Sequence, residues 1–146
     1  ITADAFFARH LTANGGTPMG EAITQGIELI RERKLSYRAN GISHYRPWIF
    51  MITDGEPTDS VALASSAIRE GENNKNFMFY PVGVEGANLG QLEALSVRKP
   101  LALKGLSFRE MFVWLSNSLG TVSRSQIDDA PALENPAAPD GWAVAG

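Results

Sequence analysis

Two stretches of sequence decide the fold: WIFMITDGEPTD at residues 48–59 and GGTPMG at residues 15–20. Residues 48–53 form a continuous apolar run without polar alternation, and Asp54-Gly55 closes it. Such a run predicts a strand of a parallel sheet, buried on both of its faces. The glycines of the other stretch predict a turn that leads into a helix. Each stretch therefore lies where one element gives way to the next.

Both loops offer oxygen atoms of the kind that Mg²⁺ prefers, a hydroxyl from Thr17 and a carboxylate from Asp54. In a parallel α/β sheet, the loops at the carboxyl ends of the strands gather where ligands bind. The sequence therefore predicts that Thr17 and Asp54 lie together and contribute to a divalent metal site. Two protein ligands alone leave such a site incomplete.

A purely structural interpretation of the same residues stays open. Thr17 can serve as the N-cap of the next helix, with Pro18 in the first helical position. The residues after the strand can simply form a turn. Glu56 and Asp59 are further acids beside the site. They can tune metal affinity, or they can solvate the loop, with Asp59 as the cap of the helix that follows.

Composition narrows the class of protein. The chain has 146 residues, of which 44% are hydrophobic and 20% charged, as expected of one globular domain with a core. Its net charge of −3 argues against a nucleic-acid partner, which would need clustered basic surface. No apolar run approaches the roughly 18 residues of a membrane span. Cysteine is absent, which excludes disulfides and thiolate metal sites and favours a reducing compartment.

The rest of the chain alternates helical and extended patterns. Helices are expected over residues 3–11, 18–34, 60–70 and 89–95 and from Phe108 onward, and strands over residues 48–53, 77–84 and 101–103. This alternation predicts an open, doubly wound α/β fold with a parallel sheet and helices on both faces. Three strands would leave long unpaired edges, which proteins normally avoid. The sheet is therefore expected to be incomplete.

Local signals mark several boundaries. Asn88 and Ser107 are the expected N-caps of the last two helices, and Pro81 predicts an edge, a bend or a gap in the second strand's ladder. Residues 71–76 are expected to form a turn. Residues 125–146, rich in Ala, Pro, Asp and Asn, predict an extended tail without a core of its own, separate from a domain at 1–124. Trp142 could dock this tail onto the domain.

Catalytic motifs are missing from the sequence. It contains no phosphate loop and no GxGxxG, GxSxG or HExxH pattern. His10 and His44 are the only histidines, and neither lies near a strand end beside a plausible nucleophile. The sequence therefore argues against serine hydrolysis.

The segments GGTPMGEAI and RPWIFMITDGEPTD resemble the von Willebrand factor A domain family, and FYPVGVEGANLGQLEALS and FREMFVWLSNS extend the resemblance over residues 10–123. A small bacterial cytoplasmic branch associated with tellurium resistance is the most similar. The resemblance implies a Rossmann-like fold, a metal-ion-dependent adhesion site, and a function in binding rather than catalysis. In such a site, Mg²⁺ or Mn²⁺ binds an Asp or Glu of a protein partner. Thr17 matches the family's second metal motif and Asp54 its third.

The family's first metal motif, Asp-x-Ser-x-Ser, begins at none of the aspartates of this chain. Since the chain starts at Ile1 rather than methionine, truncation is the simplest interpretation, with the motif and its strand preceding Ile1. We then expect weak or absent Mg²⁺ binding, and an open sheet edge that recruits a strand-completing segment or a swapped second copy.

Two alternatives to a metal-dependent adhesion module remain. One is a degenerate fold that binds partners without metal. The other is an accessory subunit of a chelatase-like ATPase system, for which a neighbouring ATPase domain would be the distinguishing feature.

Overall fold

The computed structural model describes residues 5, 7, 10, 12, 15–127 and 131–145. In chain order, its elements are α1 (Met19–Ala39), β1 (Trp48–Thr53), α2 (Ala62–Asn73), β2 (Met78–Gly83), α3 (Leu89–Leu95), β3 (Leu101–Leu103), α4 (Phe108–Ser123) and β4 (Ala143–Ala145). The helix predicted over residues 3–11 lies mostly outside the described residues. The strand predicted over residues 48–53 has the bounds of β1.

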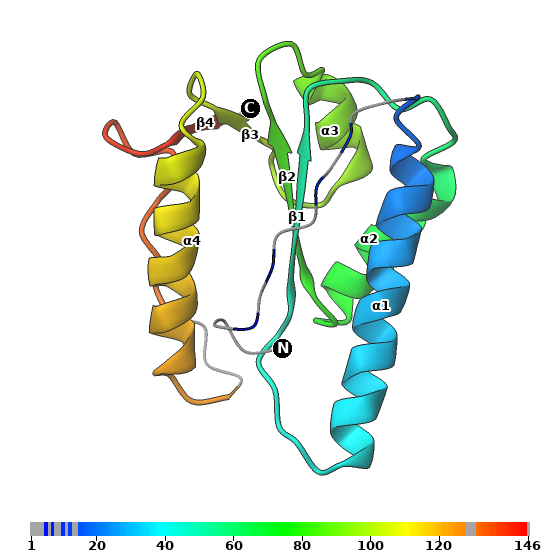
Figure 1. The fold of residues 1–146 in the computed structure, drawn as a ribbon, viewed down its shortest axis with the longest axis vertical. Helices are drawn as coiled ribbons and strands as arrows, with labels where there is room; N and C mark the ends of the chain where they lie inside the picture. The colour runs from blue at the N-terminus through cyan, green and yellow to red at the C-terminus, as the bar shows by residue number, and fades with distance from the viewer. Residues whose placement is uncertain are drawn as a thin grey trace.

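The four strands form one sheet in the order β1-β2-β3-β4. β1, β2 and β3 are parallel, and β4 runs antiparallel to β3. Helices α1 and α2 lie on one side of the sheet and α4 on the other (Figure 1). The predicted α/β class, with a mainly parallel sheet between helices, is confirmed.

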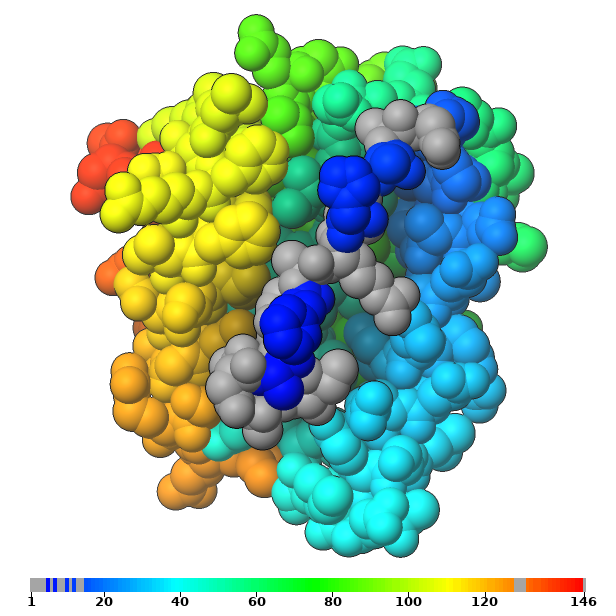
Figure 2. Space-filling model, in the orientation of Figure 1, coloured from blue at the N-terminus to red at the C-terminus, as the bar shows by residue number. Residues whose placement is uncertain are grey.

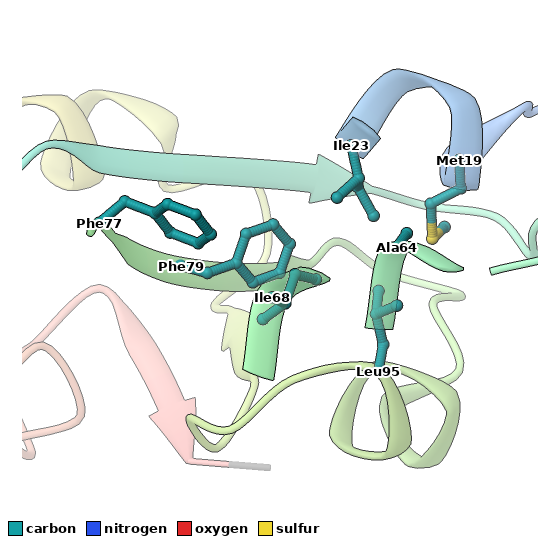
Figure 3. Close-up of a cluster of buried hydrophobic side chains, with 7 residues drawn as sticks. All are labelled: Met19, Ile23, Ala64, Ile68, Phe77, Phe79 and Leu95. Carbon is teal, nitrogen blue, oxygen red and sulfur yellow. The ribbon is translucent and has the colours of Figure 1, made fainter. Parts of the chain in front are cut away.

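Two apolar clusters hold the layers together. On the α1 and α2 side, Phe77 and Phe79 meet side chains from three helices (Figure 3). The buried members of this cluster are Met19, Ile23, Ala64, Ile68, Phe77, Phe79 and Leu95. On the other face, Val82, Leu103, Met111, Trp114, Trp142 and Ala143 form the second cluster. The sheet thus carries a core on each face, as a doubly wound fold requires.

β1 is less buried than its sequence predicts. Ile49 and Met51 pack against the first cluster and Phe50 against the second, so helices do cover both faces of the strand. All three side chains nevertheless remain partly exposed, and Ile52 is 40% exposed. The reason is that β1 is an edge strand, which within the described residues pairs only with β2.

The tail supplies a strand that the sequence pattern did not predict. β4 pairs with β3, and the Lys104 backbone N–H donates to Trp142 O at 2.9 Å. The Lys104 ammonium group donates to Gly141 O at 2.6 Å. Trp142 is buried in the second cluster, as a docking role for it implies. Three residues with no apolar alternation give no local strand signal, so pairing with β3 determines their conformation.

Two helices extend beyond their predicted ends. α1 continues to Ala39 and ends in a turn at Asn40-Gly41, with a positive φ of 65° at Gly41. α2 continues through Asn73, so only the end of the turn predicted over 71–76 is correct. Gly71 allows the Phe77 ring to pack against this end of the helix, because an alanine Cβ there would overlap the ring.

Pro81 lies in an inner strand without breaking its ladder. The N–H of Met78 and of Val84 donate to Pro47 O and Thr53 O, so even-numbered residues of this strand face β1. The nitrogen of Pro81 therefore faces β3, which pairs with β2 only from Val82 onward. Of the predicted alternatives, the edge position is wrong, because β2 lies between β1 and β3.

Candidate functional site

The two loops singled out by sequence meet at the carboxyl edge of the sheet, beside the N-terminal end of α1 (Figure 1). The Thr58 N–H donates to Thr17 O at 2.9 Å. Gly20, in the first turn of α1, lies against the backbone of Ser60, and an alanine Cβ at position 20 would overlap Ser60 O. This close approach requires glycine, and it fixes the two loops relative to each other.

Asp59 joins the loops more tightly. Its carboxylate accepts hydrogen bonds from the N–H of Gly20 at 3.0 Å and of Glu21 at 2.8 Å, across about forty residues of chain. These bonds, first that from Gly20 and then that from Glu21, lower the pKa of Asp59 below its usual range. Asp59 thus caps α1, and the predicted role as cap of the following helix is wrong.

The predicted N-cap role of Thr17 is also wrong. α1 begins at Met19, with Pro18 in the N-cap position. The side chain of the N-cap residue therefore makes no capping hydrogen bond. The N–H groups of Gly20 and Glu21, in the first turn, already donate to Asp59. The Thr17 hydroxyl is therefore not needed for the helix terminus.

Asp54 lies directly after β1 in a turn held by its neighbours. The Gly55 N–H donates to Thr53 Oγ1 at 3.2 Å, and the Thr53 hydroxyl donates to Gly55 O at 3.1 Å. The position of a Cβ on Gly55 lies 3.7 Å from Thr17 Oγ1. The structure therefore brings the Thr17 hydroxyl next to the residue that follows Asp54.

The side-chain oxygens at the carboxyl edge fall into two groups: those that accept hydrogen bonds from described residues, and those that make no such bond. Glu56 accepts a hydrogen bond from Asn88 Nδ2 at 3.1 Å, and Asp59 binds the start of α1. Within the described part of the chain, neither the Thr17 hydroxyl nor the Asp54 carboxylate has a hydrogen-bond partner. Thr17 is half-buried and Asp54 is exposed. The two predicted ligands are thus among the oxygens left available, as is the Thr58 hydroxyl beside Gly16.

These two oxygens match the chemistry of Mg²⁺ but supply only part of its coordination shell, since the ion takes near-octahedral oxygen ligands. Among the residues that the structure describes, no three His, Cys, Asp or Glu side chains converge to hold a metal ion. Further ligands would have to be water or groups from outside this set. Whether metal binds here stays a prediction.

Comparison with known families gives one result. The model of the von Willebrand factor type A domain matches residues 6–110. The chain belongs to this family. Von Willebrand factor type A domains generally act as protein-interaction modules rather than enzymes. Comparisons with curated proteins and with solved structures gave no significant match. Among the described residues, no helix is both long and apolar enough to cross a membrane.

An apolar groove leads to the site. It has a volume of about 540 Å³ and follows β1 and α1 as far as Gly16 and Thr17. Figure 2 shows described atoms of the N-terminal segment, in dark blue, on this face of the molecule between α4 and α1. Pro47 O and Thr53 O accept bonds from Met78 and Val84, on the β2 side of β1. The backbone groups of Trp48, Phe50 and Ile52 therefore face the other side of β1, the open edge, where no described strand pairs with it.

Sequence reasoning missed a polar cluster at the amino ends of the strands, at the end of the sheet away from Thr17 and Asp54. Glu72, with a side chain only 5% exposed, forms ion pairs with Arg46 and Arg98, each at 2.7 Å. It also accepts the Phe79 N–H at 2.7 Å. That N–H faces the side of β2 where β3 has not yet begun, so Glu72 takes the place of a strand there. No local pattern joins residues 26 positions apart.

Proposed function

We propose that this von Willebrand factor type A domain binds an acidic group of a protein partner through a divalent metal ion at Thr17 and Asp54. The observation that carries the proposal is the division of oxygens at the carboxyl edge. The neighbouring acids Glu56 and Asp59 are hydrogen-bonded, whereas the Thr17 hydroxyl and the Asp54 carboxylate have no partner among the described residues. Unsatisfied polar groups held by a rigid scaffold are typical of binding sites.

The residues of this chain position the ligands, and the ion supplies the charge that an acidic partner recognises. Asp54 would hold a Mg²⁺ or Mn²⁺ ion by its carboxylate and Thr17 by its hydroxyl. The Thr53 and Asp59 hydrogen bonds fix the two loops, so little ordering is required when a ligand binds. An incomplete shell leaves positions for water and for a partner carboxylate.

The open edge of β1 forms part of the same proposal. The backbone groups at Trp48, Phe50 and Ile52, which pair with no described strand, would accept an extended segment, either a strand-completing segment or a swapped second copy. A segment laid parallel to β1 would end level with Thr53, where the residues after it could contribute further metal ligands. A stable monomer by light scattering, with no additional peptide by mass spectrometry, would argue against this part. Assignment to the tellurium-resistance branch, and a bacterial cytoplasmic location, stay predictions.

Affinity purification from the native source tests the metal-dependent interaction. The wild-type protein in Mg²⁺ should retain a partner that EDTA releases, and Thr17→Ala and Asp54→Ala should each reduce its recovery while the domain remains folded by circular dichroism. Asp140→Ala, which removes an exposed carboxylate from the tail, is the matched control and should retain the partner. Equal recovery in EDTA would support the metal-independent alternative instead.

A further inference from the structure

A second hollow lies between α1 and α2, near the start of β2. It is therefore at the amino ends of the strands, whereas Thr17 and Asp54 are at the carboxyl ends. Its volume is about 310 Å³, and Ile27, Ile30 and Phe77 contribute apolar side chains to its lining. An apolar cavity of roughly 150 Å³ already binds benzene, so this hollow has room for one large apolar side chain.

The α1 side of the rim is basic. Lys34 and Arg38 lie four residues apart, which places them on the same face of the helix. The Lys34 ammonium group donates to Asn76 O at 3.0 Å and to Asn76 Oδ1 at 3.4 Å, both neutral acceptors. Arg38 forms no ion pair within the described residues. Neither positive charge therefore has a carboxylate partner in the part of the chain that the structure describes.

Neighbouring side chains do not neutralise the positive charges of Lys34 and Arg38. Arg31, also on the rim, is already paired with Glu28 through Nε at 2.8 Å. Partial burial, followed by the charges of Arg38 and Arg46, lowers the pKa of Lys34. Glu70 stands on the α2 side and would repel an acid placed there. An incoming acidic group is thus directed to the α1 side.

We propose that this hollow binds an acidic peptide segment of another protein, with an apolar side chain in the hollow and an adjacent carboxylate between Lys34 and Arg38. Nucleic acid fits less well, because its binding rests on many phosphate contacts, whereas this rim offers only two cations without a carboxylate partner in the described chain, over an apolar floor. The site is separate from the proposed metal site, so it should bind its peptide in EDTA and in Asp54→Ala.

Fluorescence polarisation with the labelled peptide acetyl-GSDDLLGSG-amide tests the proposal. We expect saturable binding that weakens about five-fold or more when the aspartates are replaced by asparagine, when the leucines are replaced by glycine, or in Lys34→Gln/Arg38→Gln. Arg33→Gln is the matched control, since its guanidinium stacks on Tyr37 at 5.9 Å instead of lining the hollow. It should bind as the wild type does.

Three results would overturn the proposal. One is the absence of saturable binding, and a second is equal affinity for the asparagine or glycine peptide. The third is stronger binding to a single-stranded DNA oligonucleotide or to phosphatidylserine vesicles with the same dependence on Lys34 and Arg38, which would assign the hollow to nucleic acid or to membrane.

Discussion

The two edges of the sheet carry polar clusters of opposite character. At the amino edge, Glu72 is buried and bound by two arginines and a backbone N–H. At the carboxyl edge, Asp54 is exposed and Thr17 half-buried, and within the described chain their side-chain oxygens have no partner. The first arrangement is complete without any ligand, whereas the second is held in place but unsatisfied. This contrast separates polar groups that stabilise the fold from polar groups available for binding.

Removal of Glu72 should have the largest effect on stability. In Glu72→Ala, two arginines and the Phe79 N–H lose their acceptor, so the free energy of unfolding should fall by about 2–3 kcal/mol. The value is at the low end for a buried pair because Arg46 and Arg98 are 27% and 36% exposed. Urea denaturation measures it, with Glu70→Ala, an exposed acid on the same helix, as the control. A loss equal to that of the control would show that the cluster contributes no stability.

Gly20→Ala should be next in size. A Cβ at this position overlaps Ser60 O, so the loops must separate at a cost of about 2 kcal/mol. Gly26→Ala in the same helix meets no atom within 4 Å and should instead stabilise the domain by up to about 1 kcal/mol. Denaturation of the two variants side by side would reveal opposite signs. Stabilisation by both would contradict the close contact between the loops.

Asp59→Asn should have a smaller, pH-dependent effect. Hydrogen bonds from Gly20 and Glu21 lower the pKa of Asp59 in the folded state, so its stabilisation is present above the unfolded pKa of about 3.9. It is lost as the pH falls through the folded value. Thermal melts should show the variant a few degrees less stable at pH 7, with the difference vanishing on acidification. A difference in melting temperature that stays constant from pH 7 down through the pKa of Asp59 would rule out the charged cap.

Asp54→Ala and Thr17→Ala should have the least effect on stability. Their side-chain oxygens bind nothing else in the described structure, so the free energy of unfolding should change by no more than about 0.5 kcal/mol. Urea denaturation without metal provides the measurement. Unfolding of both variants would instead show that these two residues maintain the fold rather than await a ligand.

Sequence patterns correctly predicted the elements that depend on interactions between residues close together in the chain. The apolar run at 48–53 gave β1 its bounds, and Asn88 caps α3 by accepting the Gln91 N–H at 3.2 Å. Ser107 precedes α4 as expected, although its side chain makes no capping bond. The two loops of the candidate site were placed together correctly because parallel topology brings the carboxyl ends of strands to one edge.

Contacts between distant residues could not be read from the sequence. Asp59 looked like the cap of the nearest following helix, but it binds α1, 38 or 39 residues away. The Glu72 cluster depends on which N–H of β2 remains unpaired, and this is known only once the register of β3 is known. β4 has no amphipathic pattern, so its strand conformation depends on its pairing with β3.

The central claim is that the free oxygens of the carboxyl edge bind a divalent ion. Titration of ¹⁵N-labelled protein with Mn²⁺ tests it directly, because paramagnetic broadening locates even weakly bound ions. We predict that the amide signals of Thr17, Asp54 and Gly55 broaden first, that excess Mg²⁺ reverses the effect, and that Asp54→Ala abolishes it. Broadening centred on acids elsewhere, or none at these residues, would contradict the account.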